Sequence, residues 1–295
     1  MENYMRVLFM GTPDFAVPTL RALCESGYEV VGAVTQPDKP KGRGHHLTPP
    51  PVKVFATERG IPVYQPLTLK GEEFAALLAT LDPEVIVVVA YGKILPVNVL
   101  EYPKYKCVNV HGSLLPEYRG AAPMQRAIID GKTETGITTM MMDVGLDTGD
   151  MLIMRDIEIG ENMTAGELHD ELSQLGAAVL EETVNALLKD ELKPEKQNHE
   201  EFTYASMLSK DLSPIDWNCS AKDIHNKIRG LSPWPSANAK LNGKTVKIHR
   251  SILAPEKGTY AGQIVETGKR LVVCCGDMNC IEILNLQAEG KKAMS

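Results

Sequence analysis

Apolar runs alternate with amphipathic stretches over the first two-thirds of the chain. Runs such as Val85–Ala90, rich in β-branched residues, are typical of parallel strands buried on both faces. Between them, apolar residues recur at helical spacing. The alternation predicts βαβ units in an α/β, Rossmann-like, doubly wound sheet. We expect its strands at Met5–Gly11, Tyr28–Thr35, Ile61–Tyr64, Val85–Ala90, Lys106–Val110, Gly136–Met142 and Met151–Ile159, and its helices at Phe15–Glu25, Val52–Arg59, Glu72–Leu81, from Pro123 onward and at Thr164–Lys189.

The last third shows a different pattern, in which short alternating segments are separated by glycines. After one helix at Ala221–Arg229, this spacing predicts a small, OB-like β-barrel. A polar run at residues 190–201, broken by Pro194, separates the two patterns. We therefore expect a catalytic domain at 1–189, a linker at 190–205 and a C-terminal β-barrel domain at 206–295. The barrel strands are expected at Ala237–Leu241, Thr245–Leu253, Ala261–Thr267, Leu271–Cys275 and Cys280–Gln287.

The composition is that of an ordinary globular protein of 295 residues, 43% hydrophobic and 23% charged. No apolar run approaches the ~20 residues that cross a bilayer, so no membrane association is expected. The amino terminus shows no leader with a cleavage site, and the six cysteines form no regular framework, which favours reduced thiols in a cytoplasmic protein. Cys274, Cys275 and Cys280 could be soft metal ligands, but no CxxC pair accompanies them and we expect no metal.

The formal net charge of −7 is unevenly distributed along the chain. Residues 206–295 contain 13 Lys and Arg against 8 Asp and Glu, a balance of +5. Residues 1–205 contain 18 against 30, a balance of −12. A basic tail on an acidic body indicates contact with a polyanion, with simple surface solvation as the alternative.

Candidate chemistry lies where the strand at Lys106–Val110 ends. Asn109 and His111 share a face because strand side chains alternate, and they come to the carboxyl edge of the sheet, where open α/β proteins bind ligands. The amide is a neutral donor, and an imidazole gains or loses a proton near neutrality. The irregular segment Asp143–Asp150 can return a carboxylate to this edge. From these facts alone, structural hydrogen bonding is the commoner role for such residues, and catalysis is the alternative.

The run HGSLLPEYRGAAP, from His111 to Pro123, resembles the signature of the 10-formyltetrahydrofolate-dependent formyltransferase family. The similarity extends from FMGTPDF near the amino end to LQAEGKK near the carboxyl end. It implies transfer of a formyl group from 10-formyltetrahydrofolate to the free amino group of methionyl initiator tRNA for translation initiation. We expect no metal cofactor for such a reaction, because the activation resides in the folate, and no obligate protein partner is evident from the sequence. Family members are expected to continue beyond Ser295, and Glu117 stands where a basic residue is more usual.

The resemblance also implies roles for individual residues. It places a catalytic trio on Asn109, His111 and Asp147, in which the amide and imidazole stabilise the formyl oxygen and the carboxylate orients the imidazole and relays a proton. It implies that the pterin ring of the folate lies near the end of the Val89–Gly92 segment. The residues implied for folate are Ser113, Leu114, Leu115, Pro116, Tyr91 and Gly92.

The resemblance implies that the loop Gln36–Thr48, with Lys39, Lys41 and Arg43, enters the acceptor arm of the tRNA. This loop is locally basic within an acidic domain, as phosphate contact requires. The alternative is a surface excursion without function, which is what most long loops are.

Three other functions compete with this assignment. The same chemistry could act on a ribonucleotide amine or a sugar nucleotide, or hydrolyse the formyl folate. A dinucleotide-dependent oxidoreductase would share the fold, but the first strand is followed by GTPDFA, which lacks G-x-G-x-x-G. A nonenzymatic RNA-binding module is favoured only by the small barrel and its charge.

Overall fold

The structure is a computed structural model that describes residues 5–41 and 46–294, the side chains of Lys41 and His46 excepted. The chain forms two compact units. Unit 1 comprises the chain up to Arg119 together with Gly136–Asp156 and Asp170–Thr203. Unit 2 comprises Gly120–Thr135, Ile157–His169 and the chain from Tyr204 onward. The domain boundaries expected at 189 and 206 stay a prediction, since the units draw on several separate stretches of sequence.

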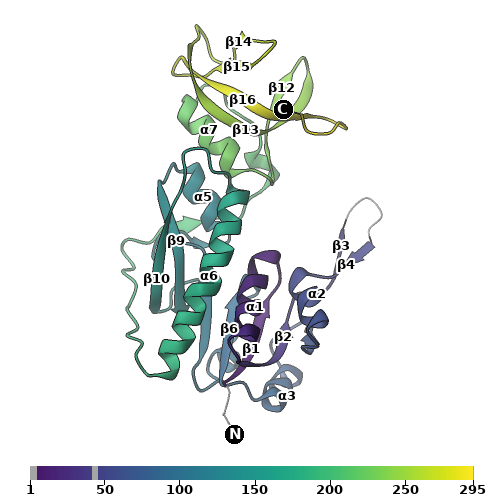
Figure 1. Cartoon of the computed structure of the whole chain (residues 1–295), viewed down its shortest axis with the longest axis vertical. Coiled ribbons are helices and arrows are strands. Elements are labelled where there is room, and N and C mark those ends of the chain that lie inside the picture. Colours follow the sequence, from purple (N-terminus) through teal and green to yellow (C-terminus); the bar gives the residue numbers. More distant parts are fainter. Residues whose placement is uncertain (1–4, 42–45, 295) are drawn as a thin grey trace. The chain divides into compact units, whose positions relative to one another are not determined.

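A seven-stranded mixed sheet forms the centre of unit 1 (Figure 1), in the order β10-β9-β7-β6-β1-β2-β5. The run from β7 to β5 is parallel, and β9 pairs with β7 in the antiparallel sense. The strands are β1 (Arg6–Gly11), β2 (Glu29–Val34), β5 (Val63–Tyr64), β6 (Val85–Val89), β7 (Cys107–His111), β9 (Glu134–Met141) and β10 (Met151–Glu158). The predicted α/β class is confirmed.

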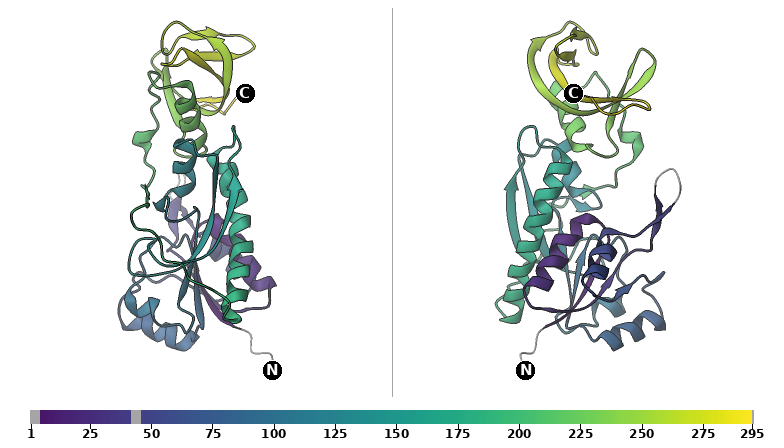
Figure 2. Two further views of the ribbon diagram at one scale, coloured as in Figure 1. Left: turned by 90° about the vertical axis from the view of Figure 1, so that its left-hand side faces the viewer. Right: turned by 45° about the vertical axis from the view of Figure 1, so that its right-hand side comes forward.

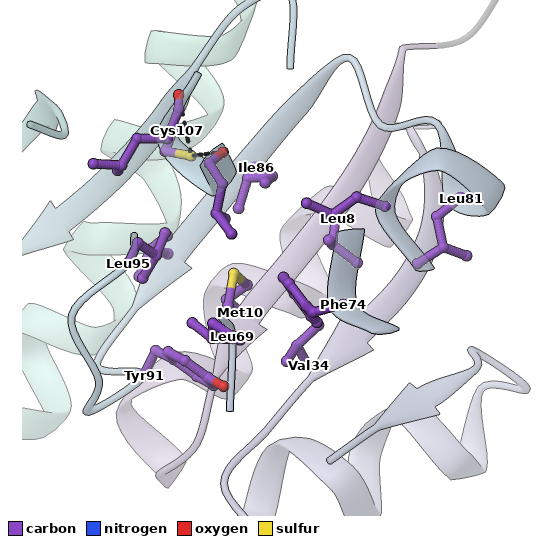
Figure 3. Packing of buried hydrophobic residues seen from close by; sticks show 14 residues of the cluster. Leu8, Met10, Val34, Leu69, Phe74, Leu81, Ile86, Tyr91, Leu95 and Cys107 are labelled. Carbon is purple, nitrogen blue, oxygen red and sulfur yellow. Dashed lines mark hydrogen bonds between the residues drawn. The ribbon is translucent and has the colours of Figure 1, made fainter. Parts of the chain in front are cut away.

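Helices cover both faces of this sheet. On one face, side chains of α3 (Glu72–Leu81) and α4 (Val97–Leu100) pack on alternate residues of β1 and β6. Figure 3 shows this cluster, in which Met10, Phe74 and Tyr91 lie close together. On the other face lie α1 (Val17–Glu25) and α6 (Ala165–Leu188), and the Ser173 hydroxyl of α6 donates to the Phe15 carbonyl oxygen. A further helix, α2 (Pro51–Glu58), follows the ribbon of β3 (Lys39–Lys41) and β4 (His46–Thr48).

The packing of α6 decides which way β7 presents its side chains. Gly176 of α6 lies against Val110: a Cβ atom added to this glycine would stand 3.1 Å from Cγ1 of Val110. Because strand side chains alternate, Asn109 and His111 face away from α6. The apolar residues of β7 thus anchor the strand and leave the amide and the imidazole on the opposite face.

Unit 2 contains a five-stranded antiparallel sheet in the order β12-β13-β16-β15-β14. Its strands are strongly curved (Figure 2), and the pairing of β13 with β16 has three register shifts. Ile224 and Ile228 of α7 join a core that includes Ile248 and Ile281 of the sheet. The elements of this unit are α5 (Pro123–Ile129), β11 (Tyr204–Ala205), α7 (Ala221–Gly230), β12 (Ala237–Leu241), β13 (Lys244–Lys257), β14 (Ile264–Glu266), β15 (Leu271–Cys274) and β16 (Asn279–Ala288). The short strand β8 (Arg119–Gly120) has one residue in each unit.

Most predicted elements are present, with differences at their ends. The strand expected at Thr245–Leu253 runs to Lys257, because register shifts let one strand bend and keep pairing. The strand expected at Ala261–Thr267 is shorter, Ile264–Glu266. The segment predicted as a linker is partly structured: Glu195 forms a β-bridge with Met151, and the Gln197 side chain is buried.

Candidate active site

Asn109 and His111 lie at the end of β7 and are almost fully buried, with 8% and 6% of their surfaces exposed. On one side β7 pairs with β6, and on the other Asn109 and His111 are paired with Met140 and Thr138 of β9. Strands on both sides therefore fix the positions of the two backbones. The amide and the imidazole are held at a set separation on one face of the sheet.

The hydrogen bonding of His111 defines its protonation pattern. Its Nε2 lies 2.9 Å from the Tyr118 carbonyl oxygen. A carbonyl oxygen only accepts, so Nε2 carries a hydrogen and donates it. Its Nδ1 lies 3.8 Å from Oδ2 of Asp147, too far for a hydrogen bond but within ion-pair distance. The neutral ring therefore presents an unprotonated Nδ1, and the protonated ring presents Nδ1–H toward the carboxylate.

The structure thus brings together the three residues expected to be catalytic, although Asp147 stands 38 positions after Asn109 in the sequence. Asp147 lies in the irregular segment after β9 and has a left-handed backbone conformation, with φ of 55°. Asp143 organises this segment: its Oδ1 accepts hydrogen bonds from the Gly145 amide, at 3.0 Å, and the Thr148 hydroxyl, at 2.6 Å. Any side chain at Gly149 would collide with the Met141 carbonyl oxygen. The turn is therefore closed tightly against the end of β9.

A buried arginine and glutamine support the same segment. The Nε and Nη2 atoms of Arg119 donate to Oε1 of Gln197 at 2.9 and 2.7 Å. The Nε2 of Gln197 donates to the carbonyl oxygens of Asp147 and Gly149 at 2.9 and 2.7 Å. Burial lowers the pKa of Arg119, and the carboxylates of Asp147 and Asp143 oppose that shift.

The loop expected to hold the folate follows directly after His111. The Thr138 hydroxyl fixes it by donating to the Ser113 carbonyl oxygen and accepting from the Leu115 amide, at 2.7 and 3.1 Å. The Ser113 hydroxyl is fully buried and donates to the Glu117 carbonyl oxygen at 2.6 Å. Ser113 and Leu115 therefore shape the loop from inside, whereas Leu114 and Pro116 are only half-buried and can meet a ligand.

Tyr91 has a different place from the one its predicted role suggests. Its ring is 2% exposed in the core cluster (Figure 3), and its hydroxyl lacks a hydrogen-bond partner among the described residues. Burial raises its pKa to about 12. Any folate contact here must use the backbone, because the ring points into the core. The adjacent Gly92 is exposed and adopts φ of 85°, with open space where a Cβ would stand.

The loop expected to contact tRNA is described at its two ends. Arg43 and the side chain of Lys41 lie outside the described residues, whereas Lys39 begins β3. Nearby, Lys53 Nζ pairs with Asp38 at 2.8 Å, and hydrogen bonds from Lys53 and Gln65 lower the pKa of Asp38. A cavity of about 250 Å³ lies beside this ribbon, lined by Thr12, Gln36, Pro37, Lys39, Pro40, Thr48, Pro49, Pro50 and Pro51.

Cys274 and Cys280 face each other across β15 and β16 and are buried. Burial raises the pKa of Cys280, and raises that of Cys275 to about 12, so the thiolate that would bind a metal is disfavoured.

In residues 5–41 and 46–294, no cluster of His, Cys, Asp and Glu is suited to holding a metal ion. No helix in those ranges has the length and hydropathy of a membrane span.

The sequence profile of formyl transferases matches residues 5–184, and that of the formyl transferase C-terminal domain matches residues 207–295. The chain belongs to the formyl transferase family. Among its relatives, the methionyl-tRNA formyltransferase of Geobacter sulfurreducens is 51% identical, over 98% of this chain and 91% of that protein. The methionyl-tRNA formyltransferase of Caldanaerobacter subterraneus is also 51% identical, over 98% of this chain and 94% of that protein.

Solved structures of formyl transferases share the fold. An N-formyltransferase from Helicobacter canadensis, in complex with folinic acid and dTDP-3-aminofucose, superposes with a TM-score of 0.73. The match covers 96% of this chain and 99% of that one, at 20% sequence identity. At this identity, the likeness supports the formyl transferase fold alone.

Sequence reasoning missed Gln197. Arg119 stands in the quoted family run but received no role, and Gln197 stands in a charged segment that has the composition of a linker. No local pattern distinguishes a buried glutamine from a solvated one, because its partners come from distant segments. The unusual burial of a polar side chain becomes visible only in three dimensions.

Proposed function

We propose that the chain transfers a formyl group from 10-formyltetrahydrofolate to the free amino group of methionyl initiator tRNA, giving N-formylmethionyl-tRNA. The supporting observation is the group of Asn109, His111 and Asp147 at one sheet edge, in a formyl transferase with about half of its residues identical to those of methionyl-tRNA formyltransferases. The reaction takes place where charged tRNA is used in translation, so we place it in the cytoplasm.

The chemistry requires a stabilised oxygen and an acceptor for one proton. As the amine attacks the formyl carbon, the formyl oxygen gains negative charge, which hydrogen-bond donors stabilise. The Asn109 amide provides one N–H, and the protonated His111 ring provides Nδ1–H, because its Nε2 is occupied by Tyr118. The Asp147 carboxylate lies 3.8 Å from Nδ1, beyond hydrogen-bond distance, so its charge stabilises the imidazolium while Nδ1–H stays available to the formyl oxygen.

Asp147 also accounts for the proton that the amine loses. While the bond between the amine nitrogen and the formyl carbon forms, the carboxylate accepts this proton as a general base. The proton then passes to the folate nitrogen whose bond to the formyl carbon breaks. The chain neither gains nor loses protons overall, and the activation resides in the folate itself.

The loop after β7 suits an aromatic co-substrate. Leu114 and Pro116 offer apolar surface on a backbone that Thr138 holds in place. The backbone of Tyr91 and Gly92 at the end of β6 is a second candidate contact, since no side chain at Gly92 blocks access. We assign the folate to this region, with Ser113 and Leu115 as the internal supports of the loop.

We assign the tRNA to the basic parts of the chain. The loop Gln36–Thr48, with Lys41 and Arg43, would contact the acceptor arm, and the sequence 206–295 has a balance of +5. The curved antiparallel sheet of unit 2 fits a small OB-like barrel, a fold that binds oligonucleotides. No other protein is required for this reaction.

A formylation assay tests the proposal. Purified protein is incubated with 10-formyltetrahydrofolate and either methionyl initiator tRNA, a ribonucleotide amine or an amino sugar nucleotide. We expect formylated methionine only on the tRNA, identified by mass spectrometry after hydrolysis of the ester. Formylation of a small amine in preference to the tRNA would assign the chain to another acceptor, and folate hydrolysis without an acceptor would identify a hydrolase.

A further inference from the structure

The segment from Glu195 to Thr203 connects the two sides of the His111–Asp147 pair. Its first residue forms a β-bridge with Met151, with two backbone hydrogen bonds of 2.8 Å. At its other end, the Thr203 carbonyl oxygen accepts from the Arg119 amide at 3.0 Å. Both ends are therefore fixed to unit 1 by main-chain contacts, although the composition of this stretch is that of a linker.

Gln197 lies within this segment and reaches the carboxylate side of the pair. Its side chain is 4% exposed, in a segment where the neighbouring residues Lys196 and Asn198 are exposed. Its Nε2 has two hydrogens, and both are used, on the carbonyl oxygens of Asp147 and Gly149. These two carbonyls flank the turn in which Asp147 adopts its left-handed conformation.

Arg119 determines which way the amide of Gln197 is oriented. A guanidinium only donates, so the atom that faces it must be Oε1, and the amino group must face the Asp147 turn. A reversed amide would lose four hydrogen bonds at once. A carboxylate in this place would keep the arginine contact but would set an oxygen against the two carbonyls.

Thr203 reaches the imidazole side of the pair. Its hydroxyl oxygen accepts from the Tyr118 amide at 2.8 Å. The carbonyl oxygen of the same Tyr118 holds Nε2 of His111. One short segment thus fixes the residue that orients the imidazole and, through Gln197, the turn that carries the carboxylate.

We infer that Gln197, oriented by Arg119, is a positioning residue that sets the place of the Asp147 carboxylate relative to His111. This role rests on the proposed function, in which Asp147 accepts the proton of the amine. Gln197 contacts the backbone of the turn and acts through Asp147. A displacement of a reacting group by about 1 Å can cost on the order of 100-fold in rate.

The test compares Gln197→Glu and Gln197→Met with the wild type and with Glu195→Gln, an exposed control in the same segment. Gln197→Glu keeps an acceptor for Arg119 and loses both donors to the turn. Gln197→Met loses the polar contacts but has a similar length. We expect kcat to fall by about 10- to 100-fold in both variants, with KM for the folate and for the tRNA within about twofold. Glu195→Gln should keep the wild-type kcat.

Each substitution is then repeated together with Asp147→Asn. If Gln197 acts through Asp147, adding a Gln197 substitution to Asp147→Asn should lower kcat by less than about a further twofold, because the carboxylate that Gln197 positions has already been removed. Melting temperatures of all variants identify any loss of folding. Should Gln197→Met fold poorly, Gln197→Glu supplies the same comparison at a temperature where it is folded.

The outcomes separate the inference from the proposed function. Wild-type kcat in either folded Gln197 variant would overturn the positioning role. It would also be overturned if the fold-decrease in kcat of the double variant equalled the product of the decreases in the two single variants. Wild-type kcat in Asp147→Asn itself would instead overturn the proposed role of the carboxylate. A rise in KM with unchanged kcat would assign Gln197 to binding and would also contradict the inference.

Discussion

At the scale of single residues, the site is organised by groups that can act only as hydrogen-bond acceptors or only as donors, such as a backbone carbonyl oxygen. The carbonyl oxygen of Tyr118 fixes the hydrogen on Nε2 of His111, which leaves Nδ1 as the ring atom for chemistry. Nδ1 faces Asp147, so the carboxylate and the ring nitrogen that can gain a proton border the same part of the site. Asn109, on the same face of β7, adds an amide that stays neutral at every pH.

Asp147→Asn and Asn109→Ala should each lower kcat by about 100- to 1000-fold, by loss of the proton acceptor and of one oxyanion donor respectively. Single-turnover formylation of methionyl initiator tRNA measures this effect directly. Asp156→Asn, an exposed carboxylate on β10, is the matched control and should behave as the wild type. More than a tenth of the wild-type rate in either active-site variant would contradict the assigned roles.

At the scale of elements, α7 shows how a helix with buried polar residues is held in unit 2. Ser220 caps its start by accepting from the Asp223 amide at 3.1 Å. On its buried face, His225 contacts the Ser251 hydroxyl and the Glu161 carbonyl oxygen, at 2.9 and 3.0 Å. Arg229, also buried, donates to the Gly160 and Met163 carbonyl oxygens. The helix is thus fixed by polar contacts as well as by its isoleucines.

Burial lowers the pKa of His225, and the charge of Arg229 lowers it further, against the effects of the Glu161 carbonyl and carboxylate. The unfolded chain therefore binds a proton at a higher pH than the folded one, starting near the ordinary histidine value of about 6.5. The stability of unit 2 should be complete above that pH and fall as the pH drops through it, by at most about 1.4 kcal/mol per pH unit.

Urea unfolding between pH 8 and pH 5.5 measures this effect. Both tryptophans of the chain, Trp217 and Trp234, belong to unit 2, so their fluorescence reports its unfolding. His225→Gln, which cannot be protonated, should show a flatter dependence of the unfolding free energy on pH. Equal slopes for the variant and the wild type would show that His225 does not titrate in this range.

At the scale of the whole molecule, charge is distributed so that a basic carboxyl-terminal third accompanies an acidic remainder. A polyanionic substrate releases condensed counterions when it meets basic groups, which makes its binding depend on salt. The acidic remainder would repel such a substrate except where it is locally basic. The loop Gln36–Thr48 is such an exception, since its sequence contains Lys39, Lys41 and Arg43.

Arg43→Ala should raise the KM for methionyl initiator tRNA and reduce the slope of log KM against log salt by about one, as expected for the loss of one phosphate contact. Initial rates at several salt concentrations give this slope. Lys189→Ala, an exposed lysine at the end of α6, serves as the control for a general change in net charge. An unchanged slope in Arg43→Ala would remove this loop from the tRNA interface.

Much of the architecture could be predicted from the sequence because the relevant signals are local. The β-branched residues of β6 and the helical spacing in α6 identify these elements without knowledge of their neighbours. Asn109 and His111 could be placed together because alternation along one strand is enough to do so. The position of Asp147 opposite them depended on the family resemblance.

Features that depend on distant partners could not be predicted in this way. Tyr91 stands next to the expected folate site in sequence, but its ring turns into the core and leaves only its backbone there. Gln197 looks like a solvated linker residue until Arg119 and the turn at Asp147 are placed beside it. The length of β13 depends on irregular pairing with β16, which has no local signature.

The contact between His111 and the main chain at position 118 has a consequence for protein engineering. Because the oxygen that orients the ring belongs to the backbone, changing the side chain at Tyr118 does not delete it, and residues tolerant of its φ of 58°, such as Asn or Gly, can stand there. Inserting a single residue between positions 111 and 118 would displace that oxygen. Substitutions at Tyr118 should therefore keep the oxygen that orients the imidazole and lose only the packing of the buried ring, whereas changes in loop length should lose the oxygen itself.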